Sequence, residues 1–110
     1  MATKNEREPF TRISAEEAKE MLQNGATIID VREKHEYDSG HVPGAGHIPV
    51  NTVYARREEL PKDNDLILIC AIGQRSALAA EMAAAAGLTR LFNVEGGTEA
   101  WIKAGEPVER

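Results

Sequence analysis

The run Leu66-Ile67-Leu68-Ile69 restricts the fold more than any other feature of the chain, because every residue in it is apolar. A strand with one face in water alternates polar and apolar residues, so this run predicts a central parallel strand covered on both faces. The alanine-rich segment 76–86 follows and predicts a helix that ends at Gly87. Together they predict an α/β domain with a mostly parallel sheet.

Strand and helix patterns alternate along the rest of the chain. Ser14 and Glu17 have the spacing of a capping box, which predicts a helix that starts after Ser14 and ends near Gly25. Pro49 cannot donate a hydrogen bond to a neighbouring strand, so the strand around it is predicted at a sheet edge. Further strands are predicted over 10–13, 27–31, 47–50 and 91–94, and helical turns over 32–37, 53–60 and 98–104, the last capped by Thr98.

Composition limits the chain to one domain and narrows its partners. Its 110 residues, 42% of them hydrophobic, suit a single core. We expect residues 1–9 to be a flexible lead-in and residues 10–110 to be the domain. The net charge of -5 argues against nucleic acid or an anionic membrane as partner. The polar start of the chain resembles no signal peptide, which predicts a cytoplasmic location.

Cys70 is the only cysteine, and it follows the central strand where a helix is about to begin. Open α/β sheets bind ligands at this end of their strands. Gly73 can adopt a positive φ that turns backbone N–H groups inward, and Arg75 and the following helix add positive charge. A lone cysteine after an apolar strand is often a small core residue, but this surrounding favours a nucleophilic thiolate.

The other chemistry-bearing residues leave three reaction classes open for such a thiolate. The three histidines, His35, His41 and His47, lie in one loop region and are expected to make structural hydrogen bonds. No spacing typical of metal ligands or of a nucleotide-binding loop is present, so no metal and no cofactor are predicted. Phosphoryl transfer, redox exchange and sulfur transfer remain, and the lack of a second cysteine excludes an internal dithiol cycle.

From Phe10 to Pro107 the chain resembles the rhodanese homology domain, and four motifs in the family's order carry the resemblance. They are Asp30-Val31-Arg32-Glu33 with Glu36-Tyr37, the segment 40–49, the segment Cys70-Ala71-Ile72-Gly73-Gln74-Arg75-Ser76, and Gly96-Gly97 with Trp101. The resemblance implies a five-stranded, mostly parallel sheet flanked by helices on both faces. It also implies a ping-pong sulfurtransferase that moves sulfane sulfur from thiosulfate or a persulfide to cyanide or a thiol.

The resemblance assigns roles to individual residues. Cys70 would carry the persulfide, and Arg75 would close a cradle around it. Asp30 and Arg32 would support the site by ionic contacts that hold loops together. The cradle itself would consist of backbone N–H groups of Ala71, Ile72, Gly73, Gln74, Arg75 and Ser76.

Two details of the loop refine this expectation. Four residues separate Cys70 from Arg75, whereas related phosphatases have five, so the loop favours a single sulfur atom over a phosphoryl group. Apart from Arg75 the loop is uncharged, and Ile72 is apolar, which favours a thiol or protein persulfide as donor. A non-catalytic persulfide carrier or protein-interaction module is the alternative, and the sequence leaves the pathway and oligomeric state open.

Overall fold

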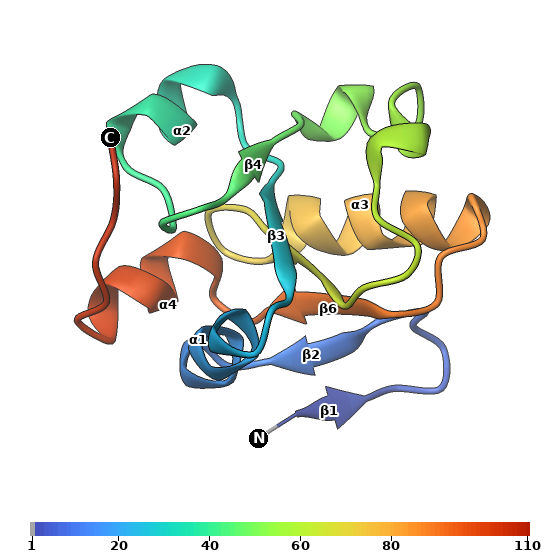
Figure 1. Ribbon diagram of the computed structural model, residues 1–110, viewed down its shortest axis with the longest axis horizontal. Helices are drawn as coiled ribbons and strands as arrows, with labels where there is room; N and C mark the ends of the chain where they lie inside the picture. The colour runs from blue at the N-terminus through green and yellow to red at the C-terminus, as the bar shows by residue number, and fades with distance from the viewer. Residues whose placement is uncertain (1) are drawn as a thin grey trace.

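The computed structural model describes residues 2–110, which form a six-stranded sheet with helices on both faces (Figure 1). The strand order is β1-β2-β6-β5-β3-β4. β1 runs antiparallel to β2, and every other neighbouring pair is parallel. The strands are β1 (Thr3–Lys4), β2 (Thr11–Ile13), β3 (Thr27–Asp30), β4 (Gly46–His47), β5 (Leu66–Ile69) and β6 (Leu91–Val94).

Helices cover both faces of this sheet. Residues of α3 belong to one of the two buried clusters, and residues of α1 and α4 belong to the other. The α-helices are α1 (Ala15–Gln23), α2 (Lys34–Ser39), α3 (Gln74–Ala85) and α4 (Gly97–Lys103), and the 3₁₀ helices are η1 (Val50–Thr52) and η2 (Arg57–Glu59). The predicted α/β architecture with a mostly parallel sheet is therefore confirmed.

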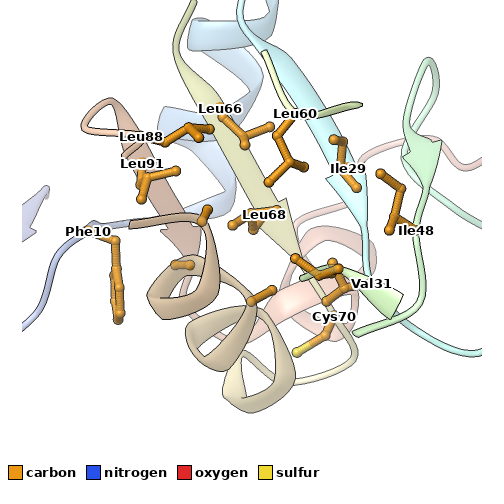
Figure 2. Packing of buried hydrophobic residues seen from close by; sticks show 14 residues of the cluster. Phe10, Ile29, Val31, Ile48, Leu60, Leu66, Leu68, Cys70, Leu88 and Leu91 are labelled. Atoms are coloured by element: carbon orange, nitrogen blue, oxygen red, sulfur yellow. The ribbon is translucent and has the colours of Figure 1, made fainter. Parts of the chain in front are cut away.

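β5 is the centre of the core, as its apolar run predicts. Leu66 and Leu68 pack in the cluster beneath α3, together with Cys70 just after the strand (Figure 2). Ile67 and Ile69 pack in the cluster beneath α1 and α4. All four strand residues are 0% exposed, because side chains of a strand alternate between faces and helices cover both.

α1 begins with the predicted capping box. The Glu17 N–H donates to the Ser14 hydroxyl at 3.1 Å, and the Glu17 carboxylate accepts from the Ser14 N–H at 2.8 Å. These bonds satisfy two backbone donors that the first helical turn leaves without partners. The start of this helix is thus determined by local sequence.

The sheet has one strand more than the predicted five. The additional strand, β1, lies within residues 1–9, a segment for which the sequence predicts no element. Thr3 pairs with Arg12, and Lys4 pairs with Thr11. Two polar residues carry no strand signal of their own, and their conformation depends on the exposed edge of β2.

Three local predictions also need correction. Residues 53–60 form no continuous helix, because only Val53 and Leu60 are buried there and no apolar stripe joins them. The predicted edge strand over 47–50 is shorter, since β4 ends before Pro49. Thr98 lies inside α4, whose cap residue is the left-handed Gly96.

Truncation of β5 tests the central position of this strand. We expect Leu68→Ala to lower the free energy of unfolding by about 3 kcal/mol, because a fully enclosed side chain leaves a cavity. Leu78→Ala on the exposed side of α3 is the control and is expected to change it by less than about 0.5 kcal/mol. Urea unfolding measures both, and equal losses would contradict the assignment of β5 as the core strand.

Candidate active site

Cys70 lies directly after β5, at the carboxyl end of the sheet and on the face that α3 covers (Figure 2). The residue is 1% exposed. The chain then turns through residues 70–76, here called the cysteine loop, before α3 continues away from it. The loop is short because the strand ends and the helix begins next to the sulfur.

The cysteine loop surrounds the Cys70 sulfur with hydrogen-bond donors. The Gly73 N–H donates to Sγ at 3.1 Å, and the backbone N–H groups of Ile72 and Ser76 also lower the pKa of the thiol. The Ser76 hydroxyl lies 3.3 Å from the same sulfur. Gly73 has a φ of +104°, a left-handed conformation that lets successive N–H groups converge. The predicted role of Gly73 rests on this conformation.

These donors determine the acidity of the thiol. Burial is the largest single influence and raises the pKa of Cys70, because it disfavours the charged form. Hydrogen bonds from the Ser76 hydroxyl and from the three N–H groups together outweigh it, so the pKa of Cys70 lies below that of an ordinary thiol. The site therefore makes the thiolate, which is the nucleophilic form, more accessible than it is in an ordinary thiol.

The start of α4 holds the outer side of the cysteine loop. Thr98 donates to the Cys70 carbonyl from its N–H at 2.8 Å and from its hydroxyl at 3.0 Å. The Glu99 N–H donates to the Ala71 carbonyl at 3.1 Å. With these carbonyls directed at α4, the N–H groups of the loop are free to point at the sulfur.

Gly97 is required for this contact. Its φ is +55°, and a Cβ atom on it would lie 2.6 Å from the carbonyl carbon and oxygen of Ala71. The sequence predicts Gly97 in a turn and Thr98 as a helix cap, and it marks neither of them as a site residue. The Gly96-Gly97 pair was the available signal, since adjacent glycines also mark a close approach of two backbones.

Arg75 occupies a different place from the one expected. Its guanidinium donates to both carboxylate oxygens of Glu36 on α2, at 2.7 and 2.9 Å, and these bonds raise the pKa of Arg75. The same bonds lower the pKa of Glu36 to about 2. Arg75 thus ties the start of α3 to α2, and within the described part of the chain its guanidinium makes no hydrogen bond to the Cys70 sulfur.

Asp30 and Arg32 form a buried ion pair at the end of β3. Arg32 Nη2 lies 2.7 Å from Asp30 Oδ2 and 2.8 Å from the Gly40 carbonyl, to which it also donates. Asp30 is 0% and Arg32 6% exposed. The pair joins the strand end to the far end of α2, so the structure places both residues in loop support rather than against the Cys70 sulfur.

Among residues 2–110, no histidine makes a hydrogen bond to the Cys70 sulfur. His41 Nδ1 is 2.8 Å from the Tyr37 carbonyl, and His47 Nε2 is 2.7 Å from the Arg32 carbonyl. Both rings stack on Tyr37, while His35 is exposed on α2. These contacts hold the loop between β3 and β4 together.

A sequence model of the family described as "Rhodanese-like domain" matches residues 14–104. The chain belongs to this family. The match includes the central strand, the cysteine loop and the glycine pair before α4.

Individual relatives extend the comparison. "Thiosulfate sulfurtransferase GlpE" of Actinobacillus pleuropneumoniae is 35% identical over 104 residues, which are 93% of this chain and 95% of the relative. The "Putative sulfur carrier protein YrkF" of Bacillus subtilis is 39% identical over 74 residues, 67% of this chain and 40% of that protein. A crystal structure of a rhodanese-related protein from Thermoplasma volcanium superposes with a TM-score of 0.82 at 35% identity, covering 89% of this chain and 96% of that one.

The surface beside the cysteine loop of this rhodanese-like domain includes an exposed apolar side chain. Ile72 is 50% exposed. A cavity of about 490 Å³ adjoins the loop and is lined by Arg12, Ile72, Gly73, Gln74, Ala77, Asn93, Glu95 and Gly96.

Within residues 2–110, no group of three His, Cys, Asp or Glu side chains could hold a metal ion. No helix in the same part of the chain is long and apolar enough to cross a bilayer.

The contact between Gly97 and the cysteine loop can be tested by adding one methyl group. We expect Gly97→Ala to lower the free energy of unfolding by at least about 2 kcal/mol more than Gly105→Ala does. Gly105 is the matched control, because its φ is also positive, at +81°, but no atom lies within 4 Å of its added Cβ. Urea unfolding measures both losses. Equal losses would show that α4 does not press on the loop.

The ion pair between Glu36 and Arg75 predicts a pH-dependent contribution to stability. The pKa of Glu36 is lowered on folding, so its contribution is present at neutral pH and is lost as pH falls from about 4.5 towards about 2. We expect Glu36→Gln to destabilise by no more than about 1 kcal/mol at pH 7, because both side chains are partly solvated.

Urea unfolding across this pH range measures the difference between Glu36→Gln and the wild type, which should shrink with acid. The control is Glu81→Gln at an exposed position of α3, for which the difference should stay constant with pH. A constant difference for Glu36→Gln as well would contradict the ion pair.

Proposed function

We propose that the chain is a sulfurtransferase that carries sulfane sulfur as a persulfide on Cys70. The observation that carries this proposal is the polar surrounding of the sulfur, to which the Gly73 N–H donates at 3.1 Å and from which the Ser76 hydroxyl lies 3.3 Å away. Backbone N–H groups of Ile72 and Ser76 also lower the pKa of the thiol. These groups stabilise a negative sulfur without any metal or second thiol. The curated relative GlpE, a thiosulfate sulfurtransferase by name, supports the same reaction class.

The reaction consists of two sulfur transfers. The Cys70 thiolate attacks the sulfane sulfur of the donor, a bond forms between the two sulfurs, and the donor leaves as sulfite from thiosulfate or as a thiolate from a persulfide. The terminal sulfur of Cys70 then carries the negative charge, which the loop N–H groups stabilise. A thiolate or cyanide attacks that terminal sulfur, and the Cys70 thiolate is restored as thiocyanate or a new persulfide leaves.

Charge pairing around the cysteine loop supports a thiol persulfide, free or on a protein, as the donor. A dianion such as thiosulfate gains most from unpaired cations, but each guanidinium near the loop already contacts a carboxylate. The apolar edge at Ile72 fits the carbon chain of a thiol better than a sulfonate group. The pairs are Arg75 with Glu36, Arg32 with Asp30, and Arg12 with Glu8.

The same contacts disfavour phosphoryl transfer. A phosphoryl group at Cys70 would need cationic donors for its oxygens, and the guanidinium of Arg75 is bound to Glu36. The sequence also places four rather than five residues between Cys70 and Arg75. Both features support a small, singly charged sulfur as the group that the loop holds.

A persulfide carrier with little turnover is the second candidate. The relative YrkF, a sulfur carrier by name, matches 67% of this chain, and Cys70 is only 1% exposed. A buried sulfur suits transfer between proteins that open the loop on contact.

We place either activity in the cytoplasm, where a lone thiol stays reduced. We propose small thiols or a protein as the partners rather than nucleic acid or a membrane.

Sulfur transfer from two donors tests the proposal. Thiosulfate and glutathione persulfide are offered to the wild type and to Cys70→Ser, with cyanide as acceptor and thiocyanate as the readout. We expect turnover by the wild type with a higher kcat/KM for the persulfide, and only the uncatalysed rate for Cys70→Ser. Thermal unfolding confirms that the variant is folded.

Intact mass spectrometry after incubation with each donor separates the candidates. Addition of one sulfur to the wild type with turnover supports the enzyme, and stable addition without turnover supports the carrier. Equal rates for the wild type and Cys70→Ser, or no sulfur added from either donor, would exclude persulfide chemistry at Cys70.

A further inference from the structure

A chain of buried hydrogen bonds extends from the Cys70 sulfur into β6. The sulfur lies 3.3 Å from the Ser76 hydroxyl, which in turn donates to Oδ1 of Asn93. The Nδ2 group of Asn93 donates to the Gly73 carbonyl at 3.1 Å. Ser76 is 0% and Asn93 5% exposed, so solvent has little access to this chain. From the sequence, Asn93 is predicted only as a strand residue.

The orientation of the Asn93 amide follows from its neighbours. A carbonyl oxygen can only accept, so the amide nitrogen must face Gly73 and the amide oxygen must face Ser76. An amide oxygen also only accepts. The Ser76 hydroxyl must therefore be the donor in its bond to Asn93.

A hydroxyl has one proton, and this count decides the direction of the Cys70 contact. When Ser76 donates to Asn93, its oxygen can only accept from Cys70, and the partner that fits is the protonated thiol. A thiolate has no proton to offer, so it forms a hydrogen bond with Ser76 only if the Ser76 proton turns away from Asn93. That turn removes the hydrogen-bond donor from the buried Asn93 oxygen.

We propose that Asn93 is a positioning residue that competes with the Cys70 sulfur for the Ser76 proton and thereby limits the fraction of thiolate. The inference rests on the proposed function only in giving this thiolate a role as nucleophile. It concerns the resting thiol, so it can be measured without any sulfur donor. The Gly73 N–H remains a donor to the sulfur in every variant that retains the loop.

Charged groups on the surrounding elements are common to all the variants compared. Arg75 interacts electrostatically with Cys70, and its own partner is Glu36. A difference between variants therefore reports the hydrogen-bond chain and not these charges. The groups on the packed elements are Asp30 and Arg32 at the end of β3, Glu33 and Glu36 at the start of α2, Arg75 of α3, Glu95 before α4 and Glu99 within it.

A double-mutant cycle on the thiolate fraction tests the competition. The ultraviolet absorbance of the thiolate is titrated below the pH range in which tyrosine side chains ionise, and there the signal comes from Cys70 because the chain has one cysteine. The proteins are the wild type, Asn93→Ala, Ser76→Ala and the double variant. We expect Asn93→Ala to raise the thiolate fraction about fivefold at a pH well below the midpoint, since the Ser76 proton becomes free for the sulfur.

In the Ser76→Ala background, Asn93→Ala should change the thiolate fraction by less than about twofold. Without the Ser76 hydroxyl there is no proton for which Asn93 and the sulfur can compete. Ser76→Thr retains a hydroxyl and should restore the full response to Asn93→Ala. If Asn93→Ala folds poorly, Asn93→Asp serves instead, because its carboxylate holds the Ser76 proton more strongly. It should lower the thiolate fraction more when Ser76 is present than in the Ser76→Ala background.

A purely structural role of Asn93 gives a different pattern. Loss of its bond to Gly73 would loosen the loop and lower the thiolate fraction equally with and without the Ser76 hydroxyl. Equal changes in both backgrounds, a lower thiolate fraction in Asn93→Ala, or no change would each overturn the proposal. The titration can succeed even if the sulfur-transfer assay fails, so the two proposals are tested separately.

Discussion

The contact between α4 and the outer side of the cysteine loop is the constraint on which the site depends. A backbone segment carries N–H and carbonyl groups in equal number, and both need partners when buried. Thr98 donates hydrogen bonds to the Cys70 carbonyl, and the Glu99 N–H donates to the Ala71 carbonyl. The N–H groups of the loop can therefore converge on the sulfur. Gly97 permits this because it has no Cβ to separate the two backbones.

A second consequence of the packing is that the sulfur accepts from an N–H dipole rather than from a free cation. Arg75 and Arg32 are each bound to a carboxylate, and they join α2, α3 and the end of β3 into one support. N–H dipoles act over a short range and suit a compact charge such as a thiolate or persulfide. The Ser76 and Asn93 side chains adjust that charge from behind, at the end of β6.

The elements predicted most accurately are those with strong local or periodic signals. β5 is apolar at every position, and Ser14 with Glu17 forms a complete capping box, so both are specified by neighbouring residues. β1 has no such signal, because Thr3 and Lys4 adopt a strand only against the edge of β2. The turns around Val53 also depend on distant contacts, since too few apolar residues are adjacent there to define a helix.

The sequence by itself determined the cysteine proposed as the nucleophile, its place at the end of a central strand and the glycine that turns the loop, because these depend on residue type and short spacing. Which partners the site residues take was decided only by the tertiary structure. Arg75 of α3 binds Glu36 of α2, and Ser76 of α3 donates to Asn93 of β6. These residues are far apart along the chain, so no local pattern encodes their contacts. Packing also brings Gly97 against Cys70, because two loop backbones meet only after the sheet has formed.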